Sequence, residues 1–178
     1  MPTERASGVT ELGSGHLRLV PTTDEHADEL LRIHRSDAVR VRWGEPEPGF
    51  PFDDEDIVAF TVFVNDQVAG FVQYAEENTP MYRHAGIDIF LDAAVQGRGV
   101  GREVVWLVAD HLVHARGHHR VVIDPAADNE PAIRCYAAVG FRPVGIMRRY
   151  ERGQDGIWHD GLLMDLIADE LVNPNGTR

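Results

Sequence analysis

The chain has 178 residues, of which 43% are hydrophobic and 26% are charged, and its 17 basic and 29 acidic side chains give a net charge of −12. This length corresponds to about one domain and this composition to a packed core, which excludes disordered and collagen-like chains. The acidic surplus attracts cations and repels phosphate backbones and anionic lipids, so we expect a cationic small molecule as partner, and neither nucleic acid nor a membrane.

The two ends of the chain predict tails around one folded unit. Residues 1–15 are polar and rich in Gly, Ser and Thr, without the apolar stretch of a signal peptide. No apolar run approaches the ~18 residues of a membrane-spanning helix. We therefore expect a flexible tail over 1–15, a single domain over 16–171, a second tail over 172–178 and a cytoplasmic location.

The first half of the domain predicts one strand, one helix and an irregular loop. Apolar residues alternate over 16–20, as in a short strand. Thr22 and Glu25 have the spacing of a capping box, which opens a helix that runs to about Ser36. Prolines and glycines over 43–51 exclude regular structure there.

The remaining elements predict a mixed sheet with helices on its faces. A hairpin over 56–64 and 68–74 is followed by a strand over 83–91. The clearest helix covers 99–116, where apolar residues recur at helical spacing. A short strand over 119–124, a helix that begins after Asp128 or Asn129 and ends at Gly140, and strands over 141–149 and 157–167 complete the chain. This order predicts an α/β (α+β) fold with about seven strands.

A glycine-rich loop before the longest helix predicts an anion site. The loop reads Gln96-Gly97-Arg98-Gly99-Val100-Gly101, and glycine lets the backbone take unusual dihedral angles and lets a ligand approach closely. The first turn of the following helix adds unpaired N–H groups and the positive end of the helix dipole, and Arg98 adds a charge. Alternatively, the glycines only cap the helix.

The spacing of the glycines separates this loop from two common phosphate-binding motifs. Arg102 stands where a dinucleotide-binding loop needs its third glycine, and the Gly-Lys-Ser/Thr of a Walker A loop is absent. The pattern Gln96-x-x-Gly99-x-Gly101 resembles the pyrophosphate loop of the GNAT acyl-CoA N-acyltransferases. The resemblance extends over most of the chain. It implies acetyl-CoA as co-substrate and a strongly twisted mixed sheet that a bulge in its fourth strand splays apart.

A second segment agrees with the same family. It reads Asn129-x-x-Ala132-x-x-x-Tyr136-x-x-x-Gly140-Phe141. The resemblance implies that Asn129 and Ala132 lie near the pantetheine arm and that Tyr136 protonates the departing thiolate, a task that a phenol of pKa near 10 can perform. Alternatively, Tyr136 only packs before the end of the helix. The neighbouring Cys135 is expected to face elsewhere and to pack.

The resemblance also implies the remaining contacts of the cofactor. Backbone groups of the fourth strand would bond the pantetheine arm and polarise the thioester carbonyl, and backbone amides of the loop would bind the pyrophosphate. The residues concerned are Ile89, Phe90 and Leu91 on the strand and Val95, Gln96, Gly97, Arg98, Gly99, Val100 and Gly101 in the loop.

Within the family, four short segments together resemble the aminoglycoside 6′-N-acetyltransferases: Gly-Ile-Asp ending at Asp88, Asp124-Pro125, Ala-Ile-Arg-Cys-Tyr ending at Tyr136, and Trp43-Gly44. The resemblance implies that Asp88 holds an ammonium group and accepts its proton, and that Asp124 holds a second ammonium. Trp43 would supply a flat wall or a cation–π face. The alternative, purely structural roles are capping of a turn for Asp124, a solvated position on a strand edge for Asp88, and packing at the end of the core for Trp43.

The predicted activity is direct acetyl transfer in a ternary complex, to an amine of a cationic small molecule such as an aminoglycoside, by a monomer or homodimer. The Pro-rich segment after Trp43 is shorter than the helical piece of the resembled enzymes, so other acceptors stay open. These are a peptide N-terminus and a siderophore hydroxylysine, whose enzymes share the style of strand over 158–166. A non-catalytic acyl-CoA sensor is the alternative from another class.

Overall fold

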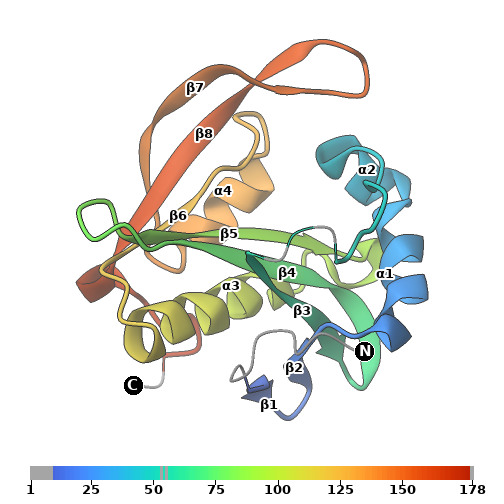
Figure 1. Ribbon diagram of the computed structural model, residues 1–178, viewed down its shortest axis with the longest axis horizontal. Helices are drawn as coiled ribbons and strands as arrows, with labels where there is room; N and C mark the ends of the chain where they lie inside the picture. The colour runs from blue at the N-terminus through green and yellow to red at the C-terminus, as the bar shows by residue number, and fades with distance from the viewer. Residues whose placement is uncertain (1–9, 53, 55, 177–178) are drawn as a thin grey trace.

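The computed structural model describes residues 10–52, 54 and 56–176, and its centre is one mixed eight-stranded sheet (Figure 1). The strand order is β1-β2-β3-β4-β5-β6-β8-β7, and every neighbouring pair is antiparallel except β5 and β6. The predicted mixed sheet is confirmed, with one strand more than expected. The strands are β1 Leu12–Ser14, β2 Leu17–Pro21, β3 Ile57–Val64, β4 Gln67–Glu77, β5 His84–Leu91, β6 Arg120–Ile123, β7 Arg142–Arg152 and β8 Trp158–Ile167.

Helices cover both faces of the sheet (Figure 1). One face packs on α3 and α4 in the larger hydrophobic core, and the other packs on α1 and α2 through a smaller core that includes Phe71 and Phe90. Within the described part of the chain, no helix is long and apolar enough to cross a membrane. The helices are α1 Ala27–His34, α2 Asp37–Trp43, α3 Val100–Asp110, which continues as a π-helical turn η3 over His111–Ala115, and α4 Glu130–Ala137.

The helical segment after β2 differs from the prediction of one helix to Ser36. A 3₁₀ turn over Asp24–His26 precedes α1, and a second helix, α2, follows Ser36 directly. The backbone N–H of Thr23, one residue later than predicted, donates to His26 Nδ1 at 3.3 Å. Because Ser36 is extended (φ −65°, ψ 147°), the chain leaves α1 and starts α2 at a new angle.

The described ends of the domain are better ordered than the predicted tails. Residues 1–9 lie outside the described residues, but β1 pairs with β2 in the register Leu12↔Leu19, so the predicted tail over 1–15 is wrong for its last part. At the other end, the N–H of Val172 donates to the carbonyl of Val139 at 2.9 Å. Backbone pairing therefore continues one residue beyond the predicted boundary at 171.

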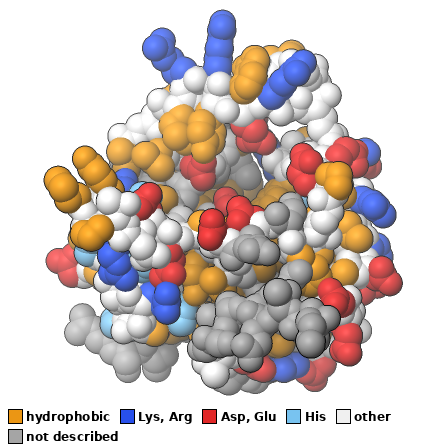
Figure 2. Space-filling model, in the orientation of Figure 1, with side chains coloured by type: hydrophobic (Ala, Val, Ile, Leu, Met, Phe, Trp, Pro, Cys, Tyr) orange, Lys and Arg blue, Asp and Glu red, His pale blue; other side chains and the backbone are white. Residues whose placement is uncertain are grey.

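The sheet splays between β5 and β6. These parallel strands pair only at Ala85↔Val121 and Gly86↔Val122 and then separate. The expected bulge is not the cause, because the register of β5 against β4 is continuous from Gly70↔Leu91 to Glu77↔His84. The space-filling view is hollowed between the β7–β8 hairpin and the α2 side (Figure 2).

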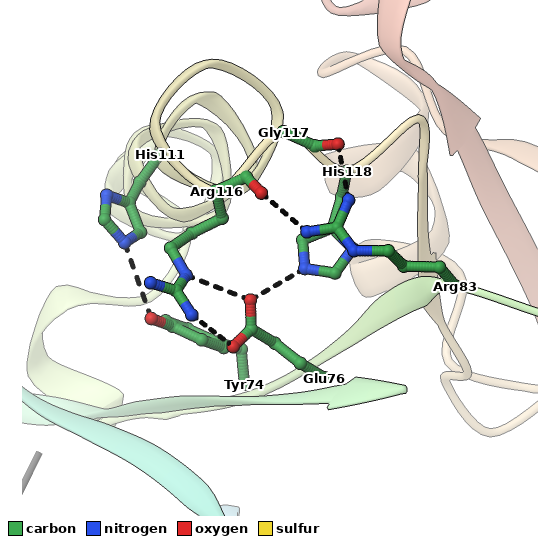
Figure 3. Close-up of polar contacts among 7 residues, drawn as sticks. All are labelled: Tyr74, Glu76, Arg83, His111, Arg116, Gly117 and His118. Atoms are coloured by element: carbon green, nitrogen blue, oxygen red, sulfur yellow. Dashed lines mark hydrogen bonds and ion pairs between the residues drawn. The ribbon is translucent and has the colours of Figure 1, made fainter. Parts of the chain in front are cut away.

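A partly buried carboxylate fixes the end of the helix formed by α3 and η3 to the sheet (Figure 3). Glu76 on β4 accepts hydrogen bonds from Arg116 Nη2 at 2.8 Å and pairs with His118 Nε2 at 2.7 Å. His118 is 1% exposed, so its imidazole belongs to the core beneath the helix end. Arg83 donates to the carbonyls of Arg116 and Gly117, both at 2.7 Å, and thereby holds the helix end.

Glu76→Gln is expected to destabilise the fold by about 2 kcal/mol at pH 7. The hydrogen bond from Arg116 is the main cause that lowers the pKa of Glu76 from 4.5 to about 2, and His118 adds to it against the effect of burial. A carboxylate whose pKa is lowered by folding stabilises the folded state at pH values above its unfolded-state pKa. That stabilisation is lost as the pH falls from about 4.5 towards 2. Urea unfolding of both proteins between pH 7 and pH 2 measures the difference.

Glu77→Gln is the matched control for this prediction. Glu77 is the next residue on β4 and is exposed. Its carboxylate accepts a hydrogen bond from the N–H of Thr79 at 2.7 Å. Its substitution is expected to leave the free energy of unfolding nearly unchanged. A Glu76→Gln penalty that persists undiminished at the acid end would show that the charge of Glu76 is not what stabilises the helix end.

Candidate active site

The splay between β5 and β6 forms a cleft of about 1110 Å³. Its walls come from β5, the glycine-rich loop, α4, the end of β6, α2 and β7. Val95 and Val100 are not among the lining residues, and their side chains pack against the larger core. Their expected contact with the cofactor is through backbone amides, and it stays a prediction. The predicted residues that line it are Trp43, Asp88, Ile89, Phe90, Leu91, Gln96, Gly97, Arg98, Gly99, Gly101, Asp124, Asn129, Ala132 and Tyr136.

The glycine-rich loop has the backbone geometry of an anion site. Gly97 (φ +71°) and Gly99 (φ +84°) are left-handed, and Gly99 is the N-cap of α3. A Cβ atom on Gly97 would meet nothing within 4 Å, so the loop is open on that side. The N–H groups of the first helical turn have no partner within the helix and carry the positive end of its dipole. Arg98 and Arg102 line the same end of the cleft.

Helix α4 places Tyr136 in the cleft. The side chain of Asn129 accepts a hydrogen bond from the N–H of Ala132 at 3.4 Å and so caps the helix. This capping role is separate from the predicted contact of Asn129 with pantetheine. Tyr136 lies about two turns on and is 9% exposed. Burial raises the pKa of Tyr136 above its ordinary value, and Cys135, Asp88 and Asp124 raise it further. The phenol therefore stays protonated at neutral pH.

Cys135 lines the cleft, and the expectation that it faces elsewhere is wrong. Its Sγ would lie 3.5 Å from a Cβ atom on Gly101, so it packs between α4 and the start of α3. Burial raises the pKa of the thiol to about 11. A thiol of that pKa is protonated at neutral pH, which agrees with packing rather than nucleophilic chemistry.

Two carboxylates from diverging strands meet in the cleft. Asp88 is on β5 and Asp124 follows β6 directly. Asp88 is open to the cleft but enclosed by protein on its other sides, and this burial is the main cause that raises its pKa. The hydrogen bond that Gln73 Nε2 donates to Asp88 at 3.2 Å lowers the pKa, and the charge of Asp124 raises it. A carboxylate with a raised pKa is a better proton acceptor than a solvated one.

Tyr150 and Glu151 on β7 complete the cleft and were missed in the sequence. The register of β7 against β8 shifts between Met147 and Glu151, and Arg149 has a positive φ of 51°. A hydrogen bond to Asp124, with burial, raises the pKa of Tyr150 to about 12. Burial also raises the pKa of Glu151. An irregularity of this kind breaks the alternation of strand residues, so no periodic signal separates Tyr150 from its exposed neighbours.

Gly161 on the facing strand β8 explains how the Tyr150 ring is accommodated. A Cβ atom there would lie 2.9 Å from Tyr150 Cδ1 and 3.1 Å from Met147 Cε. Only glycine leaves this space without a shift of the ring. The pair Gly161 and Tyr150 is therefore one packing unit, which positions the phenol beside Asp124.

Helix α2 closes the cleft from the β5 side. Arg42 pairs with Asp128 of the β6–α4 loop at 2.6 Å. Trp43 donates its indole N–H to the carbonyl of Ile89 at 3.2 Å and packs edge-on against Phe90, with ring centroids 5.0 Å apart. Trp43 therefore lines the cleft, where it could contact a substrate as predicted, and it also packs in the smaller core, as the alternative structural interpretation expected.

No group of three or more metal-ligating side chains occurs among the described residues. The cleft combines a loop with the backbone geometry of an anion site at the start of a helix, an open strand edge, three carboxylates and a buried phenol. Residues 23–141 match the model of the acetyltransferase (GNAT) family. Because this match covers more than half of the chain, the chain belongs to that family.

Similar proteins agree with this assignment. N-alpha-acetyltransferase RimI of Mycobacterium tuberculosis is 40% identical over 74 residues, which are 42% of this chain and 44% of that protein. Among solved structures, Mycobacterium smegmatis RimJ in complex with CoA-disulfide has a TM-score of 0.75 at 22% identity, over 92% of this chain and 88% of that one. Spermidine N-acetyltransferase of Vibrio cholerae in complex with CoA and spermine has a TM-score of 0.75 at 18% identity, over 90% of this chain and 100% of that one. These two structures share the fold.

Proposed function

We propose that the protein is an acetyl-CoA-dependent N-acetyltransferase that acts by direct transfer in a ternary complex. The observation that carries the proposal is the composition of one cleft, which has the glycine-rich loop at one end and Asp88, Asp124 and Tyr136 at the other. The loop suits a pyrophosphate. The acidic end suits a protonated amine, and the strand edge between them suits a thioester arm.

The chemistry assigns the proton steps to two residues. Asp88 accepts a proton from the bound ammonium, directly or through a water, which leaves an amine that can attack the thioester carbon. Backbone N–H groups of β5 bind the carbonyl oxygen as negative charge develops on it. After the nitrogen has bonded to the carbonyl carbon, Tyr136 donates its phenol proton to the sulfur as the carbon–sulfur bond breaks. The second proton that the nitrogen sheds on becoming an amide returns to the phenolate of Tyr136, directly or through a water, so that the protons balance. The raised pKa of Asp88 suits its role because it makes the carboxylate more basic, and the phenol of Tyr136 stays protonated until the sulfur leaves.

The acceptor that the cleft supports best is a multiply charged amine, such as an aminoglycoside. Three carboxylates line the acceptor end, Asp88, Asp124 and Glu151, against one cation, Arg42, which is paired with Asp128. Because Asp128 already neutralises Arg42, up to three ammonium groups on one ligand would balance this charge. A second candidate is the N-terminus of a peptide, which the 40% identity to RimI over 74 residues favours.

Thiol release with a panel of amines tests the proposal. The panel contains aminoglycosides, spermidine, N-terminal peptides, and neutral alcohols as the negative arm. Turnover confined to polycationic amines supports the first candidate, and turnover confined to peptides supports the second. Acetyl-CoA binding with no turnover on any amine would make the protein a sensor and overturn the proposed activity.

Asp88→Asn is expected to lower kcat/KM for the amine roughly 100-fold, because it removes both a charge partner and a proton acceptor. In the wild type, kcat/KM should fall as the pH drops through the raised pKa of Asp88, since the protonated acid cannot accept a proton. That acid limb should disappear in the variant.

Asp66→Asn is the control for Asp88→Asn. Asp66 lies in the β3–β4 turn, pairs with Arg18 at 2.9 Å and has a side chain that is 84% exposed. Its substitution should leave both the rate and the pH profile unchanged. An Asp88→Asn protein with the wild-type acid limb would remove Asp88 from the proton transfer.

A further inference from the structure

One residue of β8 faces an irregular part of β7 by itself. The two strands pair at Met147↔Gly161 and next at Glu151↔His159. Three residues of β7 therefore lie opposite Asp160 alone. A bulge of this kind leaves backbone groups of the longer strand without partners in the ladder, and it changes the directions in which the side chains of that strand point.

Asp160 forms hydrogen bonds towards both of the neighbours of β8. Its Oδ1 atom accepts the N–H of Arg149, which lies inside the bulge, at 2.8 Å. Its backbone carbonyl accepts the N–H of Ala127, in the segment that follows β6, at 2.8 Å. The N–H of Leu162 donates to the carbonyl of Pro125 in the same segment, also at 2.8 Å. Strand β8 therefore fixes the bulge of β7 and the segment after β6 relative to each other.

The side chain of Tyr150 crosses β8 to reach that segment. Strand β8 lies between β6 and β7, and Asp124 follows β6 directly. Tyr150 passes β8 at Gly161, where a Cβ atom would lie 2.9 Å from Tyr150 Cδ1. The hydroxyl of Tyr150 forms a hydrogen bond with the carboxylate of Asp124, and both residues line the cleft. The bulge, with its positive φ of 51° at Arg149, turns Tyr150 in this direction.

We propose that Tyr150 is a specificity-determining residue, which holds the carboxylate of Asp124 in the orientation that binds a second ammonium group of the acceptor, and that Asp160 is the positioning residue for Tyr150. The inference rests on the proposed function, in which Asp88 takes the nitrogen that reacts. The acceptor class that this arrangement selects is a diamine or polyamine.

The hydrogen bond from Tyr150 leaves Asp124 able to bind a cation. A carboxylate has two oxygens and accepts several hydrogen bonds, so one phenol does not occupy it fully. A side chain that is already fixed loses less conformational freedom when its ligand binds. The phenol therefore favours an ammonium group that arrives at the one place where the carboxylate is held.

A tyrosine that only packs on β8 would behave differently on substitution. Phenylalanine keeps the ring of Tyr150 over Gly161 but has no hydroxyl, so Asp124 would lose its hydrogen-bond donor. If the ring only fills space, Tyr150→Phe changes the rates with all amines alike. If the hydroxyl orients Asp124, the loss is confined to acceptors that carry a second ammonium group.

The test compares each of two diamines with the amino alcohol of the same length. The pairs are 1,4-diaminobutane with 4-aminobutan-1-ol and 1,5-diaminopentane with 5-aminopentan-1-ol, so that a hydroxyl replaces the second ammonium. We expect kcat/KM of the wild type to favour a diamine at least ~10-fold, because a hydrogen bond between charged groups is stronger than a neutral one. Tyr150→Phe should reduce this preference about fivefold, through a higher KM for the diamine, and change kcat/KM for the amino alcohol less than about twofold.

Two substitutions of Asp160 test the positioning role separately, also in case Tyr150→Phe does not fold. Asp160→Ala removes the acceptor of the Arg149 N–H and should lower the preference for diamines in the same direction. Asp160→Asn keeps a side-chain oxygen that can accept this N–H, and we expect it to restore most of the preference. An Asp160→Asn protein as unselective as Asp160→Ala would overturn positioning through this hydrogen bond.

Tyr82→Phe is the matched control, because Tyr82 is 69% exposed and does not line the cleft. It should leave the preference unchanged. A wild-type preference in a folded Tyr150→Phe protein would overturn the role of Tyr150, and equal kcat/KM of the wild type for diamine and amino alcohol would overturn the second ammonium site. Absence of turnover with every amine would instead overturn the proposed function, so the failures are distinguishable.

Discussion

Gly99→Val is expected to weaken acetyl-CoA binding at least ~100-fold, the largest effect on affinity that we expect from one substitution. Gly99 has φ +84° and is the N-cap of α3. A β-branched residue at positive φ is strained, so the loop would rearrange and the first-turn N–H groups would lose their common direction. A valine side chain would also occupy the space in which a phosphate approaches the backbone. Calorimetric titration of acetyl-CoA into both proteins measures the change.

Gly117→Val separates backbone strain from loss of the anion site. Gly117 also has a positive φ, +71°, and a Cβ atom there would meet nothing within 4 Å. It follows the π-helical turn at the far end of α3 and does not line the cleft. We expect a similar loss of stability from the two variants and a loss of binding from Gly99→Val alone. Equal affinities of the Gly99→Val and Gly117→Val proteins for acetyl-CoA would show that the glycine-rich loop does not bind acetyl-CoA.

Tyr136→Phe is expected to lower kcat by roughly 10² to 10⁴, the range of general acid catalysis. The substitution removes only the hydroxyl, so the ring keeps its contact with Phe141, whose centroid is 6.4 Å away. The affinity for acetyl-CoA should change little, because the proton is needed only when sulfur leaves. Steady-state kinetics with the best amine of the panel give kcat and KM separately.

Tyr74→Phe is the control, because Tyr74 is a buried tyrosine on β4 whose hydroxyl pairs with His111 Nε2 at 3.4 Å, outside the cleft. It should lower stability without lowering kcat. If Tyr136→Phe turns over at the wild-type rate, another donor protonates the sulfur, and Tyr136 belongs to the packing of α4 alone.

The sequence predicted most of the fold because most elements follow local rules. The alternation over 16–20, the apolar spacing along 99–116 and the cap at Asn129 all correspond to elements of the structure. The second helix, α2, was not predicted. It begins directly after Ser36 and spans only seven residues, too few for an apolar period to emerge. Its position depends on tertiary packing of Val39 and Trp43 in the smaller core.

The candidate site was predictable where it is made of consecutive residues and not where it depends on strand irregularity. The loop from Gln96 to Gly101 contributes most of its members to the cleft because its glycines fix a local backbone path. Tyr150 and Glu151 reach the cleft through a register shift and the positive φ of Arg149, which arise from the pairing of β7 with β8. The hydrogen bond from Trp43 to the carbonyl of Ile89 likewise depends on where α2 lies against β5.

The most direct test of this account is a crystal structure of the protein with CoA. We expect the pyrophosphate to lie over the backbone N–H groups of the loop from Gly97 to Gly101, the pantetheine arm to run along the free edge of β5, and the sulfur to come within hydrogen-bonding reach of Tyr136. A carrier bound outside the gap between β5 and β6, or an arm laid along β6 with its phosphates away from the loop, would contradict it.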